Sequence, residues 1–284
     1  MFKVNPKILA HKAAVSSGNY VTPEFILNNN TDSINLFHRY CPHRMFPLHE
    51  TGDIVQNVFC NFHGFEWSKT GEPLNNNKKI TCGQAEIGRS GLVLKDFKEP
   101  DAPWVDDLAA ETNLVYSHTI SGHSKGSWLW IMEVQADLLH IRTGQGAVHP
   151  DLSEITDLGV TSMTSGDGWA LQTCSTGWWL CIYPYTFVEW SKGCLAINYA
   201  VPDNRNDEFG FTWTSQFYYD PETTDQRRKD FEKYFQDVLV EDIAAIEKQK
   251  GKYFPLRIPH NHLEDHCVHF GQWVTTNLLK NKLV

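Results

Sequence analysis

The chain has 284 residues and a net charge of −9 at pH 7. This length predicts about two domains, and the acidic balance argues against nucleic acid or an anionic membrane surface as a partner. The most apolar stretch, 177–190, is too short to span a membrane and contains Pro184, and the first residues lack a signal-peptide core. Seven cysteines at irregular spacing argue against a disulfide framework. We therefore expect a soluble protein of a reducing compartment, the cytoplasm.

The first third of the chain alternates short apolar runs with turn residues. Strands are expected at 7–14, 33–38, 52–59, 65–68 and 87–95, with asparagine triplets at 28–30 and 75–77 marking turns. Residues 99–103 are charged and interrupted by two prolines, which is typical of a linker. We predict a small all-β domain at residues 1–98, followed by a second domain at residues 99–284.

The second domain is expected to combine strands with one long helix. Strands are predicted at 113–121, 127–134, 168–173, 178–185, 187–200, 208–219 and 268–275. The helix is predicted from Pro221 to about Lys250, with Asp220 as its N-cap and Pro221 at the first helical position. An antiparallel sheet wrapped around a long helix gives an α+β domain that can enclose a ligand pocket.

The most informative residues lie in the first domain, between positions 38 and 67. Cys41-x-His43 is followed, after 16 residues, by Cys60-x-x-His63. Each pair supplies one thiolate and one imidazole, as a Rieske [2Fe–2S] centre requires, with both cysteines on one iron and both histidines on the other. A tetrahedral zinc site is the alternative, although zinc modules usually group their cysteines in one pair and their histidines in the other.

This segment resembles the cluster-binding segment of Rieske proteins. Pro42 in the first loop and Gly64 after the second belong to the same likeness. Respiratory-chain Rieske proteins carry an extra cysteine in each loop, joined as a disulfide, whereas Phe46 and Phe62 stand at the corresponding positions here. The resemblance is therefore to the oxygenase and ferredoxin type, which lacks that disulfide.

A second group of candidate ligands lies at 133–150. Asp137 and His140 are three residues apart, so on a helix they share a face, where a carboxylate can orient a metal-bound imidazole. The segment resembles the Rieske oxygenase motif Glu-Asn-x-x-Asp-x-x-His-x₄-His-Pro, with Val134 in place of asparagine. Eight residues rather than four separate His140 from His149, which we interpret as a four-residue insertion.

The long helix supplies the third candidate ligand. At about 100° per residue its apolar stripe contains Asp242 at the centre; the stripe consists of Phe231, Phe235, Val238, Leu239 and Ile246. A buried aspartate is costly unless it binds a cation or a strong donor. The alternative is a helix phase shifted by one residue, with Asp242 facing water. The helix also resembles a late segment of Rieske oxygenases, Glu-Asp-x₄-Glu-x-x-Gln-x-Gly, matched by Glu241-Asp242, Glu247, Gln249 and Gly251.

Other histidines are weaker candidates. His118 and His123 have the x₄ spacing but lack the upstream aspartate. The C-terminal histidines have no partner motif and are expected to line the pocket or lie on the surface; they are His260, His262, His266 and His269. Residues 269–273 resemble the closing strand of the family.

Together, residues 35–275 resemble the catalytic (alpha) subunit of a Rieske non-haem iron oxygenase. The resemblance implies an oxidoreductase that uses O₂ and electrons from a ferredoxin or flavin reductase to oxidise a small organic substrate. It implies a [2Fe–2S] cluster on Cys41, His43, Cys60 and His63, and a mononuclear Fe(II) on His140, His149 and Asp242. It also implies a homotrimer in which Asp137 bridges His140 to His63 of the partner subunit. Because little chain precedes the cluster segment, monooxygenation, such as hydroxylation or demethylation, is the expected reaction.

Two other functions remain open at this point. The wide His140–His149 spacing would suit a Rieske electron-transfer protein with an inactive C-terminal domain. The second domain could also bind a small molecule while the cluster senses redox state. An oxygenase needs a mononuclear iron in addition to the two irons of the cluster, whereas neither alternative does.

Overall fold

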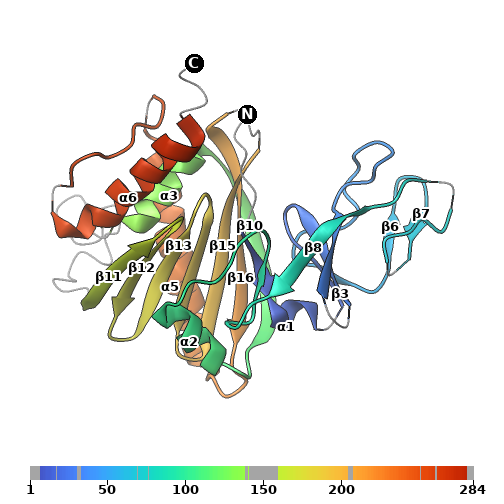
Figure 1. Cartoon of the computed structure of the whole chain (residues 1–284), viewed down its shortest axis with the longest axis horizontal. Coiled ribbons are helices and arrows are strands. Elements are labelled where there is room, and N and C mark those ends of the chain that lie inside the picture. Colours follow the sequence, from blue (N-terminus) through green and yellow to red (C-terminus); the bar gives the residue numbers. More distant parts are fainter. Residues whose placement is uncertain are drawn as a thin grey trace. The chain divides into compact units, whose positions relative to one another are not determined.

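The computed structural model describes residues 7–16, 18–30, 33–68, 70–75, 77–137, 140, 159–203, 207–249, 251–259 and 261–279. The chain forms two compact units, coloured by sequence in Figure 1. The N-terminal unit contains Lys7–Ile120 and Gln216–Pro221, and the C-terminal unit contains Ser121–Ser215 and the chain from Glu222 onward. Two long strands, β10 (Val115–Ser127) and β16 (Phe209–Tyr219), contribute residues to both units.

The N-terminal unit is built on a seven-stranded sheet and a separate hairpin. In sheet order the strands are β1 (Ile8–His11), β9 (Leu92–Leu94), β8 (Thr81–Ile87), β4 (Ser33–His38), β3 (Phe25–Asn30), β2 (Asn19–Val21) and β5 (Ile54–Val55). The hairpin pairs β6 (Val58–Cys60) with β7 (Phe65–Trp67). Helix α1 (Lys12–Val15) takes the second half of the predicted strand at 7–14, because the His11 ring accepts a hydrogen bond from the N–H of Ala13 and caps a helical turn.

The C-terminal unit is a seven-stranded sheet with helices. Its order is β10, β16, β15 (Cys194–Pro202), β14 (Thr186–Ser191), β13 (Gly177–Ile182), β12 (Trp169–Cys174) and β11 (Val160–Gly166). In Figure 1 the long helix α5 (Asp225–Ile246) runs behind this sheet, and α3 (Trp128–Ala136) lies beside α6 (Asp265–Val274). The predicted α+β class, with a sheet-rich first part and an antiparallel sheet beside a long helix, is confirmed.

The strand predicted at 127–134 is wrong, because β10 ends at Ser127 and helix α3 begins at Trp128. Nearly all of α3 is buried, so its sequence shows no polar face from which a helical period could be read. The start signal is Ser127, whose hydroxyl accepts a hydrogen bond from the N–H of Leu129 at 3.2 Å. Asp137 therefore directly follows a helix, as the C-cap of α3.

The strand predicted at 268–275 is also wrong, because this segment belongs to helix α6. Its buried residues recur with helical spacing: His266, Cys267, Phe270, Gly271 and Val274. This spacing starts two residues before the stretch interpreted as a strand, which hid it. Helix α2 (Pro103–Ala110) begins at the last residue of the stretch 99–103 that was expected to be a linker.

Two further boundaries differ from the sequence prediction. The apolar run 187–200 is two strands, joined by a turn at Lys192 and Gly193, where the glycine has φ +78°. Helix α5 begins at Asp225 rather than Pro221, because the hydroxyl of Thr224, not Asp220, accepts from the N–H of Arg227. Within the described residues, no helix is long and apolar enough to cross a membrane.

We expect Thr224→Ala to lower the free energy of unfolding by about 1 kcal/mol and the melting temperature by about 2–4 °C, because the first turn of α5 loses its side-chain cap. Thr224→Ser keeps the hydroxyl and should melt close to the wild type. Thermal unfolding followed by circular dichroism measures both. An unchanged transition in the alanine variant would show that the cap contributes nothing.

Candidate functional site

Two loops with matching backbone geometry present Cys41 and Cys60. The N–H of Met45 donates to the Cys41 carbonyl, and the N–H of Gly64 donates to the Cys60 carbonyl, each at 2.8 Å. The closing residue of each loop has positive φ, +55° at Met45 and +69° at Gly64. A left-handed residue with a Cβ costs roughly 1–2 kcal/mol, whereas glycine adopts this conformation readily. The same turn is thus built twice, once with glycine and once with methionine.

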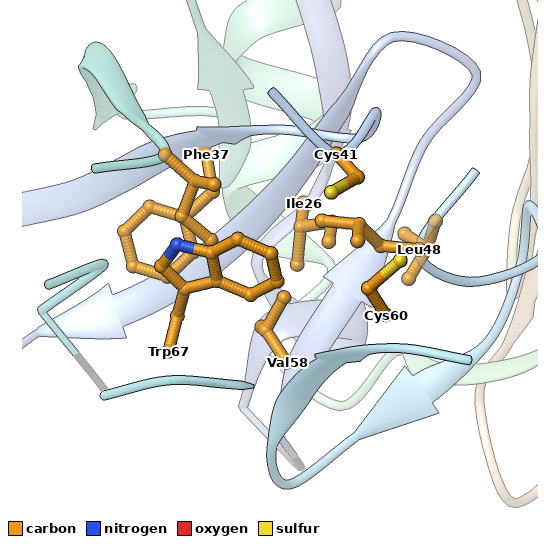
Figure 2. Close-up of a cluster of buried hydrophobic side chains, with 9 residues drawn as sticks. Ile26, Phe37, Cys41, Leu48, Val58, Cys60 and Trp67 are labelled. Atoms are coloured by element: carbon orange, nitrogen blue, oxygen red, sulfur yellow. The ribbon is translucent and has the colours of Figure 1, made fainter. Parts of the chain in front are cut away.

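The cysteines and histidines of these loops occupy different environments. Cys41 and Cys60 are each 1% exposed and belong to a buried cluster shown in Figure 2, together with Val21, Ile26, Phe37, Leu48, Val58, Trp67 and Ile80. His43 and His63 are exposed, with their Nδ1 atoms 3.3 Å apart and their ring centroids 4.8 Å apart. Thiols gather on the buried side and imidazoles on the solvent side.

This segregation fits a two-iron cluster better than a single zinc ion. A [2Fe–2S] centre of the Rieske type takes two cysteines on one iron and two histidines on the other, whereas zinc requires all four ligands around one point. Among the described residues, no three His, Cys, Asp or Glu side chains converge on such a point. Burial raises the pKa of the Cys41 thiol, and the backbone N–H groups of His43 and Arg44 lower it, as donors toward a thiolate ligand do.

A pair of aromatic rings joins the two loops. Phe46 and Phe62 stack with their ring centroids 5.4 Å apart and an interplanar angle of 19°. These are the two positions at which a loop cysteine is absent from the sequence. A stacked pair contributes about 0.5–1.5 kcal/mol beyond its buried area. The loops are therefore connected by packing at the place where a disulfide would connect them.

A second site forms where α3 and α5 meet. His140 lies between two carboxylates, with Nε2 3.4 Å from Oδ1 of Asp242 and Nδ1 3.5 Å from Oδ2 of Asp137. Asp242 is 1% exposed, and its Oδ2 accepts a hydrogen bond from Nε2 of Gln135 at 2.7 Å. Asp137 caps the C-terminal end of α3. One imidazole thus has a carboxylate at each ring nitrogen.

Charge at this site favours a cation. Burial lowers the pKa of His140, but the hydrogen bonds and charges of Asp137 and Asp242 outweigh burial and raise that pKa to about 9. Without a bound metal, His140 therefore holds a proton at neutral pH. An imidazole and a carboxylate that approach each other from two helices also form a donor set suited to non-haem iron. His140 and Asp242 thus supply one imidazole and one carboxylate of the ligand set that a mononuclear non-haem iron takes.

Helix α5 positions Asp242 through its apolar face. Phe235, Leu239, Asp242 and Ile246 are its buried residues, at successive spacings of four, three and four. Glu241, the neighbouring acid, is only half-buried. If the helix phase were shifted by one residue, Glu241 would be buried and Asp242 would lie toward the solvent. The structure shows the opposite, so Asp242 is the acid that faces inward.

The other candidate residues are accounted for as follows. His149 and His260 lie outside the described residues. His123 pairs with Asp203 at 2.7 Å, and His118 stacks on Phe217. His269 contacts the Tyr183 hydroxyl through Nδ1 at 2.9 Å.

The remaining two C-terminal histidines are also placed. His262 lies in the short 3₁₀ turn η2 (His262–Glu264). Burial lowers the pKa of His266 to about 4, so that ring is neutral at pH 7. The structure therefore brings His140 together with Asp137 and Asp242.

Three polar residues were missed by the sequence analysis. Gln135 follows by one position the place where the Rieske oxygenase motif has asparagine, which was a usable signal. Glu133 is buried, accepts a hydrogen bond from the Tyr253 hydroxyl at 2.5 Å, and has its pKa raised by burial to about 7. Glu189 in β14 is 7% exposed, and burial raises its pKa to about 8. No local sequence pattern marked Glu189.

A pocket lies against His140 and Asp242. It is small, with a cavity volume of about 30 Å³, and it is partly open to solvent. Its wall comes from α3, the sheet and α5, with Gln135, Asp137, Gln172, Trp179, Phe187, Glu189, Tyr234, Phe235 and Leu239 among the lining residues. A small molecule in this pocket would sit beside the second site.

Comparisons with known proteins concern the first site and the fold. The family model of the Rieske [2Fe-2S] domain matches residues 7–84, a range that contains all four candidate cluster ligands. The sequence search of curated proteins gives no match.

Solved structures with a similar fold include two forms of the quaternary ammonium Rieske monooxygenase CntA. The apo form has a TM-score of 0.68 and 15% identity, covering 98% of this chain and 89% of that chain. The complex with gamma-butyrobetaine has a TM-score of 0.65 and 16% identity, covering 95% and 88%. NdmA of Pseudomonas putida CBB5 has a TM-score of 0.53 and 16% identity, covering 95% and 88%.

At these identities the likeness concerns the fold, and it extends over both units of the chain. The resemblance to Rieske oxygenase catalytic subunits, predicted from the sequence, is confirmed by the Rieske family match and by this shared fold. The chain therefore has the fold of the Rieske oxygenase catalytic subunits and carries a Rieske [2Fe–2S] domain at residues 7–84.

Proposed function

We propose that the protein is a Rieske oxygenase, which uses O₂ and electrons from a ferredoxin or flavin reductase to oxidise a small organic substrate by monooxygenation. The observation that carries this proposal is the position of His140 between Asp137 and Asp242 at the wall of a pocket. We assign the cluster to a domain of residues 1–98 and catalysis to residues 99–284. The location we propose is the cytoplasm.

The chain's own residues divide the work between two sites. Cys41, His43, Cys60 and His63 hold the [2Fe–2S] cluster. His140, Asp242 and His149 hold a mononuclear Fe(II), which when bound supplies the chemistry of O₂ activation. Gln135 holds the Asp242 carboxylate in one orientation through its 2.7 Å hydrogen bond, and Asp137 orients the His140 ring from its Nδ1 side.

We propose that the electron passes between subunits of a homotrimer. Its entry to the second site would be Asp137, which bridges His140 to His63 of the partner subunit. Asp137 is 22% exposed at its side chain, and His63 is exposed, so both groups are available for a contact of this kind. The study of CntA that concerns carnitine oxidation also concerns inter-subunit electron transfer in that enzyme.

Monooxygenation is the mode that the comparisons favour. CntA is named a monooxygenase and has been solved with gamma-butyrobetaine and with L-carnitine. A mutant of NdmA has been solved with caffeine and with theobromine. Both relatives thus accommodate small nitrogen compounds. For this chain, the small pocket beside His140 shares Trp179, Glu189 and Tyr234 with a wider pocket of about 510 Å³, which has room for such a molecule.

Substitution Asp242→Ala should lower the iron content from about three to about two atoms per chain, because it removes a ligand of the mononuclear site and leaves the cluster. Iron assay after anaerobic reconstitution, with the cluster absorption spectrum recorded in parallel, measures both sites. Glu241→Ala, at the neighbouring half-buried acid, should retain about three atoms. A wild-type protein that holds only two irons after reconstitution would contradict the oxygenase proposal.

Substitution Gln135→Leu should weaken iron binding at the second site by about 10–100-fold, because the Asp242 carboxylate loses the donor that orients it. Competition with a chelator of known affinity, monitored separately from the cluster spectrum, measures the change. Gln226→Leu is the matched control. Gln226 also donates to an aspartate, Asp230, at 2.8 Å, but this pair is exposed, on the helix α5 that carries Asp242. Equal affinities in the two variants would show that Gln135 has no role in the site.

Turnover under ¹⁸O₂ distinguishes the two oxygenation modes once a substrate is found by screening for substrate-dependent O₂ uptake. Monooxygenation places one labelled oxygen atom in the product, or in the released formaldehyde where a methyl group is removed, and the other in water. Mass spectrometry of the trapped products measures the label. Two labelled atoms in one product molecule would exclude monooxygenation.

A further inference from the structure

The pocket beside His140 contains a second buried carboxylate, that of Glu189. Its residue is 7% exposed, and in the described part of the chain its side chain makes no hydrogen bond and no ion pair. Asp242, in the same pocket, differs because Gln135 and His140 approach both of its oxygens. A buried carboxylate without a partner is unfavourable in an isolated chain. Glu189 is therefore available to bind a polar or charged group of a ligand in the pocket.

Aromatic rings surround this carboxylate. Glu189 on β14 pairs with Trp179 on β13, so the two side chains share one face of the sheet. Phe187, two residues along β14, lies on the same face, and α5 places Tyr234 and Phe235 in the same pocket. Burial raises the pKa of the Tyr234 phenol, and the charge of Glu189 raises it further.

The same residues connect the inner pocket with the exterior. Trp179, Glu189 and Tyr234 line both the pocket at His140 and a second, more open pocket whose wall includes Thr176, Ser191, Arg227 and Asp230. Glu189 lines both pockets, whereas His140 lines only the inner one. A group bound at Glu189 would therefore hold the rest of the molecule near the second site.

Arg227, the basic residue among the described residues that line the open pocket, makes its hydrogen bonds elsewhere. Arg227 lines the open pocket, but its guanidinium donates to the Ser191 hydroxyl at 2.8 Å and to the Lys192 carbonyl at 3.0 Å. No lysine or arginine is among the residues found to line the inner pocket. Among the described lining residues, then, none supplies the inner pocket with a positive charge, and a ligand could supply it.

We propose that Glu189, with the rings of Trp179 and Tyr234, binds the positively charged nitrogen of an organic cation, and that such cations are the substrate class of this pocket. The inference rests on the proposed oxygenase function, since it names what the same pocket takes. A carboxylate attracts the charge directly, and aromatic faces attract a cation through their quadrupole while they exclude water. A compact ammonium group, including a fully methylated one that cannot donate a hydrogen bond, satisfies both.

Binding to the holoprotein tests this proposal. Choline, tetramethylammonium and benzyltrimethylammonium are the cationic probes, and 3,3-dimethylbutan-1-ol is the uncharged match of choline in shape. Isothermal titration calorimetry under anaerobic conditions, with the cluster oxidised, measures affinity without turnover. We expect at least one cation to bind, and choline to bind about tenfold or more tightly than its uncharged match.

Two variants assign the effect to Glu189. Glu189→Gln keeps the shape of the side chain and should weaken cation binding by about tenfold or more, while Asp230→Asn, which removes a negative charge from the open pocket only, should leave it unchanged. Cluster absorption and melting temperature verify that both variants are folded. A wild type that binds no cation, or a Glu189→Gln variant that binds cations as tightly as the wild type, would overturn the proposal.

A third outcome would also overturn it. Equal weakening of choline and 3,3-dimethylbutan-1-ol in Glu189→Gln would mean that the group is a hydrogen-bonding acid for neutral substrates. The titrations need neither O₂ nor electrons, so their failure leaves the iron content of Asp242→Ala as an independent test of the oxygenase. Loss of the oxygenase function would likewise leave cation binding measurable.

Discussion

The buried carboxylate of Asp242 is the constraint around which the C-terminal unit is arranged. A charge at 1% exposure on the apolar face of α5 is tolerated only with strong partners. Gln135 on α3 donates to one oxygen, and His140 approaches the other. These contacts require α3 and α5 to meet at fixed positions. The sheet then leaves a pocket against the pair, so the arrangement that stabilises the aspartate also creates the site.

The N-terminal unit solves a similar problem with two loops. Each loop must present a cysteine inward and a histidine outward, and the hydrogen bonds that close at Met45 and Gly64 fix that geometry. The stacked rings of Phe46 and Phe62 then hold the loops against each other. Packing between half-exposed rings is weaker than a covalent link. It keeps the exposed histidines close without a second cysteine in either loop.

The sequence predicted the features that depend on residues close together in the chain, and it missed those that depend on residues far apart in the chain. The cluster ligands lie within two or three residues of each other in each loop, and the inward phase of Asp242 follows from the period of α5. Helix α3 escaped because it is buried on nearly all sides and carries no amphipathic period. The Gln135–Asp242 bond joins residues 107 positions apart, and Glu189 becomes conspicuous only when its strand neighbours and α5 are in place. Such features depend on tertiary contacts.

The two acids of the pocket illustrate how burial separates roles. The chain supplies Asp242 with a hydrogen-bond donor, Gln135, and a neighbouring imidazole, His140, and this arrangement suits a metal ion. Glu189 has none supplied in the described structure, and burial raises its pKa to about 8, so it lies near the point where a ligand decides its charge. A positive ligand would stabilise the ionised form, whereas a neutral one would leave the acid protonated.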